Sequence, residues 1–188
     1  MWTKLKNLIL DILFPQFCLN CEKEGSLLCQ DCESLLEISD FHKPFSTFYL
    51  KDLYFPCSFQ NPLARALIQK FVGKPFIKEL SKSLSALILA HFQLLDNKPD
   101  FTDFVLMPVP SNRKELKQRG YSPSQELAKE LSKSFNIPVV SERESVKDKK
   151  ILLVDSVYSL NCQLEECAKT LKESGAQEII GITVARLN

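Results

Sequence analysis

The sequence predicts an α/β protein with a parallel sheet, preceded by a small four-cysteine module. From residue 101 onward, short apolar runs alternate with amphipathic stretches at the spacing of strand–helix–strand units, in which the strands run parallel. Four of the 7 cysteines cluster near the N-terminus. The chain of 188 residues is 45% hydrophobic and 25% charged, so it can bury a core without disulfide bonds.

The strands and helices are expected in a definite order. Ser122, Pro123 and Gln125 form a helix-start signature, because a serine N-cap is followed by proline at N1 and an amide at N3. The last helix ends at Gly175. The expected strands are residues 48–53, 104–107, 137–140, 151–154 and 179–184. The expected helices are residues 61–72, 76–95, 123–135 and about 163–175.

Charge and hydrophobicity exclude several classes of protein. The formal net charge of +1 is incompatible with a histone-like nucleic-acid coat or an acidic disordered tail. No apolar run approaches the roughly 20 residues that a membrane-spanning helix needs. Asn7 and Asp11 interrupt the N-terminal apolar stretch, which excludes a signal peptide. Leu5 to Leu13 instead show helical spacing and predict a short amphipathic helix, packed on the protein or, alternatively, on a membrane surface.

The clustered cysteines follow the pattern C-x2-C-x7-C-x2-C. Each C-x2-C pair can place two thiolates on one side of a tight turn, and two facing turns supply the four sulfurs of a tetrahedral Zn2+ site. Four thiolates leave no open coordination position, which favours a structural ion. Disulfide bonds and an iron–sulfur cluster are the alternatives, the former disfavoured by the missing secretory signal. The predicted ligands are Cys18, Cys21, Cys29 and Cys32.

A candidate site follows the strongest strand signal, residues 151–154. In open α/β sheets, ligands bind at the carboxyl ends of the strands. Asp155 comes next, and an acid at a strand tip can hold a metal ion or a sugar hydroxyl. The loop that follows leads to a helix N-terminus, whose amide groups suit a phosphate. The alternative is a plain strand-to-helix connection in which Asp155 caps a turn.

Several blocks of the sequence resemble one family. Residues 151–163 look like the phosphoribosyl-diphosphate (PRPP) motif of type I phosphoribosyltransferases, which runs four hydrophobics, two acids, two hydrophobics and Thr-Thr-Gly-x-Thr. Leu13-Phe14-Pro15, followed by the four cysteines, is similar to the opening of ComF/GntX family proteins. Further blocks resemble that family at Leu67-Ile68-x-Lys70-Phe71-x-Gly73, Pro108-Val109-Pro110, Arg113, Arg119-Gly120-Tyr121, Gln125-Glu126-Leu127-Ala128, Gly175-Ala176 and Thr183-Val184-Ala185-Arg186.

The resemblance implies an N-terminal helix and zinc finger in residues 1–40 and a phosphoribosyltransferase-like domain in residues 41–188. The PRPP or phosphate site would comprise Asp155, Ser156, Ser159, Leu160, Asn161, Cys162 and Gln163. Ser156 stands where the family has its second acid, and Asn161 stands where it has glycine. These departures imply weak or absent transferase activity, with Mg2+ as the cofactor if PRPP binds.

Two basic stretches are candidates for binding phosphate. Arginine suits phosphate because its guanidinium donates two hydrogen bonds at once. The first stretch is expected to be a loop and contains Arg113, Lys114, Lys117 and Arg119. The second spans residues 65–82 and contains Lys70 and Lys74. Phe71 and Tyr121 are expected to be exposed and to stack on bases. A solvated charged surface is the alternative for both stretches.

The ComF resemblance implies a factor that handles incoming single-stranded DNA during natural transformation. Such a protein would be cytoplasmic, in part at the inner face of the cytoplasmic membrane. The alternatives are a phosphoribosyltransferase that uses PRPP and Mg2+ on an unknown acceptor, and a scaffold that docks a transformation helicase or another DNA-processing protein.

Overall fold

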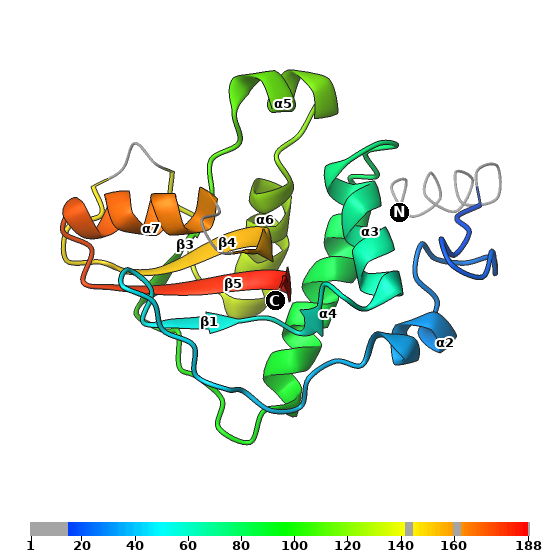
Figure 1. The fold of residues 1–188 in the computed structure, drawn as a ribbon, viewed down its shortest axis with the longest axis horizontal. Coiled ribbons are helices and arrows are strands. Elements are labelled where there is room, and N and C mark those ends of the chain that lie inside the picture. Colours follow the sequence, from blue (N-terminus) through cyan, green and yellow to red (C-terminus); the bar gives the residue numbers. More distant parts are fainter. Residues whose placement is uncertain (1–14, 142–144, 160–162, 188) are drawn as a thin grey trace, which may run out of the picture. The chain divides into compact units, whose positions relative to one another are not determined.

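A computed structural model describes residues 15–141, 145–159 and 163–187 (Figure 1). The predicted N-terminal helix, residues 5–13, lies outside these ranges. The chain divides into two compact units, the first ending at Glu37 and the second beginning at Ile38. Among the described residues, no helix combines the length and hydrophobicity that crossing a bilayer requires.

The first unit contains the four cysteines and little regular structure. Phe17 and Glu24 form an isolated antiparallel bridge, which closes a tight turn between them. Helix α2 spans Gln30–Glu33 and is followed by a 3-10 helix, η1, over Ser34–Leu36.

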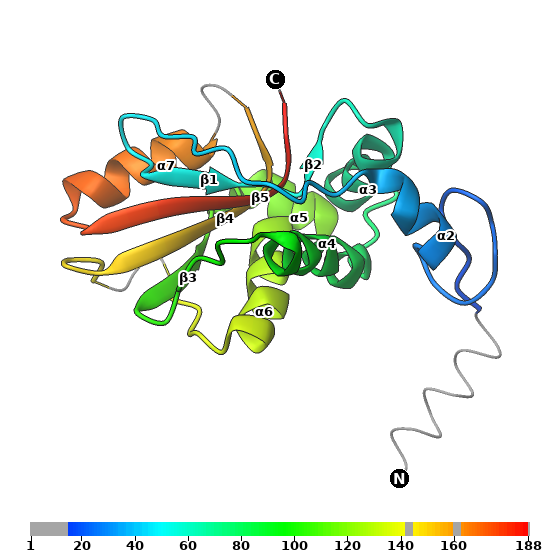
Figure 2. The same cartoon turned by 90° about the horizontal axis from the view of Figure 1, so that it is seen from below.

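The second unit is built on a parallel sheet, which confirms the predicted α/β fold class. Its strand order is β1-β5-β4-β3, and β2 also pairs with β5 (Figure 2). Every one of these strand pairs is parallel. The strands are β1 (Asp52–Tyr54), β2 (Cys57–Ser58), β3 (Phe104–Pro108), β4 (Lys150–Tyr158) and β5 (Glu178–Arg186).

Helices cover both faces of this sheet. Side chains alternate between the faces of a strand, and Ile151 and Leu153 of β4 lie in one core cluster with residues of α7. Leu152 and Val154 point to the opposite face and are also fully buried. The helices are α3 (Pro62–Val72), α4 (Leu80–Leu94), α5 (Arg113–Arg119), α6 (Pro123–Phe135) and α7 (Gln163–Glu173).

Four predicted element boundaries were wrong. The helix predicted for residues 76–95 begins only at Leu80, because Phe76 has a φ of 62°, outside the helical range. Residues 137–140 form a single bridge to Leu106 rather than a strand, since Pro138 lacks an N–H group for a longer ladder. The strand predicted for residues 48–53 is displaced to β1, and the one predicted for 151–154 continues to Tyr158.

The start of α3 offers a test of the fold. The Asn61 side chain accepts hydrogen bonds from the N–H groups of Leu63 and Ala64, both at 3.0 Å. Asn61→Ala should therefore lower the free energy of unfolding by about 1 kcal/mol, measured by urea denaturation. Asn61→Asp keeps the acceptor and should stay near the wild-type value; an equal loss in both variants would contradict this role of the side chain.

Candidate functional site

The four cysteine sulfurs of the first unit converge on one point. All four Sγ atoms lie within 4.8 Å of one another, and those of Cys21 and Cys29 are 3.5 Å apart. Sulfurs bound at about 2.3 Å around a tetrahedral ion would be separated by roughly 3.8 Å. The residues therefore fit a metal ion held by four thiolates. Cys18, Cys29 and Cys32 are buried, whereas Cys21 is exposed.

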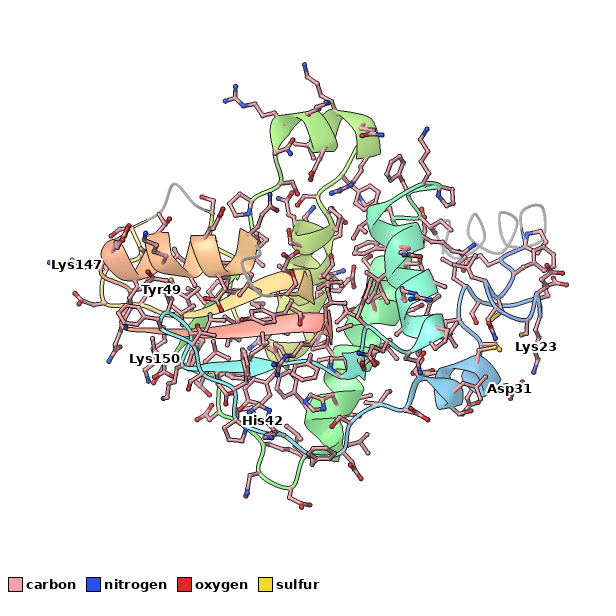
Figure 3. The ribbon with its side chains drawn as sticks, in the orientation of Figure 1. Lys23, Asp31, His42, Tyr49, Lys147 and Lys150 are labelled. Atoms are coloured by element: carbon pink, nitrogen blue, oxygen red, sulfur yellow. The ribbon has the colours of Figure 1, made fainter. Side chains whose placement is uncertain are left out.

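The local backbone explains this convergence. Cys18 lies in a tight turn, in which its carbonyl accepts from the N–H of Glu22 at 2.9 Å and its own N–H donates to Lys23 at 2.9 Å. Glu22 has a φ of 61°, which reverses the chain after Cys21. The second pair lies at the start of α2, with Cys29 at the N-cap position and Cys32 in the helix. An ion pair between Lys23 and Asp31, at 2.9 Å, joins the two parts of the unit (Figure 3).

The thiols of this cluster influence one another's ionisation. Burial alone would raise the pKa of Cys18, but hydrogen bonds from the backbone N–H groups of Cys29, Cys21 and Asn20 outweigh it and lower that pKa to about 6. The Asn20 side chain acts to lower the pKa of Cys32, but burial and the neighbouring thiols raise it to about 12. Without a cation, the crowded sulfurs do not all ionise together.

The second candidate site lies at the carboxyl end of β3, where β3 and the neighbouring β4 end unequally. β3 pairs with β4 only as far as Pro108, opposite Val154, and the Val109 N–H makes one more bond to Val154 at 2.9 Å. The ladder stops there, because the Val109 carbonyl accepts from the Ser124 hydroxyl at 2.6 Å and the Ser156 N–H donates to the Asp155 carboxylate at 2.7 Å. β4 continues through Tyr158 beside β5 alone. Asp155 and Ser156 therefore lie within the strand, not in a loop after it as predicted.

A cavity of about 250 Å³ occupies the space beyond the end of β3. It is lined by residues of β4, of the β3–α5 connection, of α5, of the starts of α6 and α7, and of the end of α3. Of the predicted site residues, the structure brings four together here: Arg119, Asp155, Ser156 and Gln163. Glu115, which is not among the predicted site residues, also lines the cavity.

Charged groups of both signs meet in this cavity. Arg119 forms an ion pair with Glu115, at 3.3 Å and one helical turn apart on α5. Burial raises the pKa of Asp155 to about 6, although the Ser156 N–H, at 2.7 Å, and the charge of Arg119 both act to lower it. The cavity therefore holds one cation, one anion and an acid whose charge depends on pH near neutrality.

Ser156 contributes an available hydroxyl group. Its side chain is buried, and its Oγ has no hydrogen-bond partner among the residues that the structure describes. A buried hydroxyl without a partner costs about 1–3 kcal/mol, so a ligand that reached this atom would gain a favourable contact. Ser159 follows β4 and is not among the described residues that line the cavity, and the predicted residues Leu160, Asn161 and Cys162 lie outside the described ranges.

The basic segment is a helix rather than the predicted loop. Asn112 caps α5 by accepting from the Glu115 N–H at 2.9 Å, and Gly120 ends it with a φ of 78°. These residues form an N-cap and a glycine C-cap that the sequence analysis overlooked. None of the residues of α5 is buried, and Figure 3 shows polar side chains projecting from it away from the sheet.

The exposed cations of α5 are Arg113, Lys114 and Lys117, and none of them has an ion pair within the described part of the chain. Lys74 is exposed after the end of α3, and Lys70 is half-buried within that helix. The expectation that Phe71 and Tyr121 are exposed was wrong. Both are buried, and the Tyr121 hydroxyl donates to the Phe71 carbonyl, so neither ring is available to stack on a base.

Comparison with known proteins adds no identification, since no protein-family model and no curated protein matches the sequence.

The cysteine cluster predicts the metal content of the purified protein. Wild-type protein should contain about one metal ion per chain, and Cys18→Ser should lose that ion together with thermal stability, because metal binding is coupled to folding of so small a unit. Elemental analysis and thermal denaturation measure the two effects. Cys167→Ser, a substitution of a half-buried cysteine in α7, is the control and should retain the ion; metal-free wild-type protein would contradict the assignment.

The raised pKa of Asp155 predicts how stability depends on pH. Since folding favours the protonated carboxyl, the contribution of this group is full below pH about 4 and is lost as the pH rises through about 6. As the pH rises from about 4 to above 6, the free energy of unfolding of the wild type should therefore fall relative to that of Asp155→Asn. Urea denaturation at several pH values measures it, and parallel curves for the two proteins would refute the raised pKa.

Proposed function

We propose that this protein binds single-stranded nucleic acid through α5, as a ComF-type factor that handles incoming DNA during natural transformation. The observation that supports it best is the display of Arg113, Lys114 and Lys117 on a helix without buried residues. Cations that are not neutralised by neighbouring acids are free to contact phosphates. These three exposed cations lie within the seven residues of α5.

Arg119 and the cavity that Asp155 lines do not contact the phosphates in this proposal. At neutral pH, Asp155 is mostly ionised, so it and Glu115 together outweigh the single positive charge of Arg119. A phosphate without a cation is therefore disfavoured inside the cavity. In the proposed complex the phosphates contact the exposed face of α5, and Lys74 adds a further cation after the end of α3.

Not every lysine of the second basic stretch is available to phosphates. Lys78 forms an ion pair with Glu126 of α6, at 3.2 Å, and Lys129 approaches the same carboxyl group at 2.9 Å. These two bonds lower the pKa of Glu126 against the opposing effect of its burial. Lys78 thus anchors the segment before α4 to α6 and is not free to contact a phosphate.

The metal of the cysteine cluster is proposed to be Zn2+ in a structural role. The donor set of four thiolates matches structural zinc sites and leaves no position for a substrate. Cys18, Cys21, Cys29 and Cys32 would hold the ion and thereby fix the turn and α2 in one unit. An iron–sulfur cluster would give coloured protein, so a colourless preparation that contains zinc distinguishes the two.

A phosphoribosyltransferase that uses PRPP and Mg2+ is the second candidate, and one observation favours it. The family's second acid is replaced by Ser156, but Glu115 brings another carboxylate to the cavity that Asp155 lines. Together with the buried Ser156 hydroxyl, these groups could hold a magnesium ion and sugar hydroxyls. In this candidate, Glu115 must exchange its bond with Arg119 for the ion, leaving Arg119 to bind pyrophosphate.

Replacing three cations near the site tests the nucleic-acid proposal. Each phosphate contact contributes about −0.7 to the slope of log affinity against log salt for single strands. Substituting Arg113, Lys114 and Lys117 together by glutamine should weaken binding to labelled single-stranded DNA and flatten this slope by about 2.

The control is an equal change of charge elsewhere, the triple substitution of the exposed Lys43, Lys98 and Lys169 by glutamine, which should leave the slope unchanged. If both triple variants bind DNA as the wild type does, α5 is only a solvated surface. Docking of a partner, such as a transformation helicase, would then take precedence.

A further inference from the structure

A second cavity lies against α5, and it is distinct from the one that Asp155 lines. It measures about 360 Å³, within the range of about 300–1,000 Å³ typical of small-ligand pockets. The two cavities share the β3–α5 connection at Val109, Pro110 and Ser111, but only this one is lined by Leu116. We propose that this second cavity binds a nucleobase of the strand whose phosphates contact α5, an inference that rests on the proposed function.

Apolar side chains exposed at this cavity match the faces of a base. Leu116 is 42% exposed and Val139 is 37% exposed, although both are large hydrophobic residues. They come from segments far apart in the sequence, α5 and the stretch that bridges to β3, and they line the same cavity. Pro108 and Pro110 add further apolar surface. A planar ring between such groups removes apolar surface from water on both sides.

Polar groups at the same cavity match the edge of a base. The Gln125 side chain is exposed and has no hydrogen-bond partner within the described residues. Its amide offers both a donor and an acceptor, and every base has an edge that complements such a pair. The hydroxyl groups of Ser111 and Ser122, 2.8 Å apart, line the cavity as well. Recognition of this kind tolerates any sequence, as a general single-strand binder requires.

The placement of charge around Leu116 favours a nucleic acid over an apolar partner. Residues three positions apart on a helix are surface neighbours, so the exposed Arg113 lies beside Leu116 on α5, whereas Arg119 on its other side is ion-paired to Glu115. Lys117 lies one turn from Arg113. A base that occupies the cavity is linked to phosphates along the strand, and the exposed cations Arg113 and Lys117 near the apolar contact are placed to meet one of them.

The test compares two probes with the full-length chain: an oligothymidylate and an abasic oligonucleotide with the same number of phosphates. Wild type should bind the oligothymidylate about tenfold more tightly, because a base contact contributes about 1–3 kcal/mol. The double variant Leu116→Ser and Val139→Ser should lose this preference and keep the salt slope, since neither residue contacts phosphate. Leu94→Ser, a change of a 50% exposed leucine on α4, is the control and should keep both.

Circular dichroism checks that the double variant remains folded, and both substitutions are at exposed positions. Equal binding of the two probes by wild type would overturn the base site alone, as would a double variant that retains the tenfold preference. Binding of neither probe by wild type would overturn the proposed function, and the base site with it.

Discussion

The end of β3 is the constraint on which the functional surface depends. Pro108 is the last residue of that strand to pair with β4, and beyond it the Val109 carbonyl accepts from the Ser124 hydroxyl at 2.6 Å instead of continuing the ladder. The neighbouring β4 continues to Tyr158, held by β5 on its other side. The strand at this end of the sheet thus stops short beside a longer one, and the chain leaves the sheet at this point. Both cavities and α5, which are proposed to bind ligands, lie at or beside this end of β3.

The segment that leaves the sheet carries α5, a short helix with its own caps and no buried residue. Because it contributes nothing to the core, its composition is free to serve a surface role. One side of the helix directs Glu115 and Arg119 to the cavity of Asp155, and another directs Leu116 to the second cavity. The rest of the helix surface carries Arg113, Lys114 and Lys117, which have no ion pair in the described part of the chain. A single element thereby offers charge, an apolar contact and polar groups in one place, the combination that single-strand binding uses.

The sequence predicted the parallel sheet and the converging cysteines because both depend on local patterns. Apolar runs at residues 104–107, 151–154 and 179–184 must lie inside, and C-x2-C pairs must turn tightly. It did not predict that β4 extends past Asp155, since whether a polar residue continues a strand depends on the pairing offered by β5. The burial of Tyr121 was missed for a similar reason, because its partner Phe71 is distant in the sequence. The caps of α5, by contrast, were present in the sequence at Asn112 and Gly120 and could have been found.

The central claim is that nucleic acid binds at α5 and at the cavities beside it. Hydrogen–deuterium exchange of the full-length chain, measured with and without a saturating single-stranded oligonucleotide, tests this most directly. The oligonucleotide should slow exchange in peptides that cover residues 109–125 and 138–141. It should change exchange little in residues 15–37 or in α4. Slower exchange confined to the cysteine unit, with residues 109–125 unaffected, would contradict the central claim and would locate the binding surface in the first unit instead.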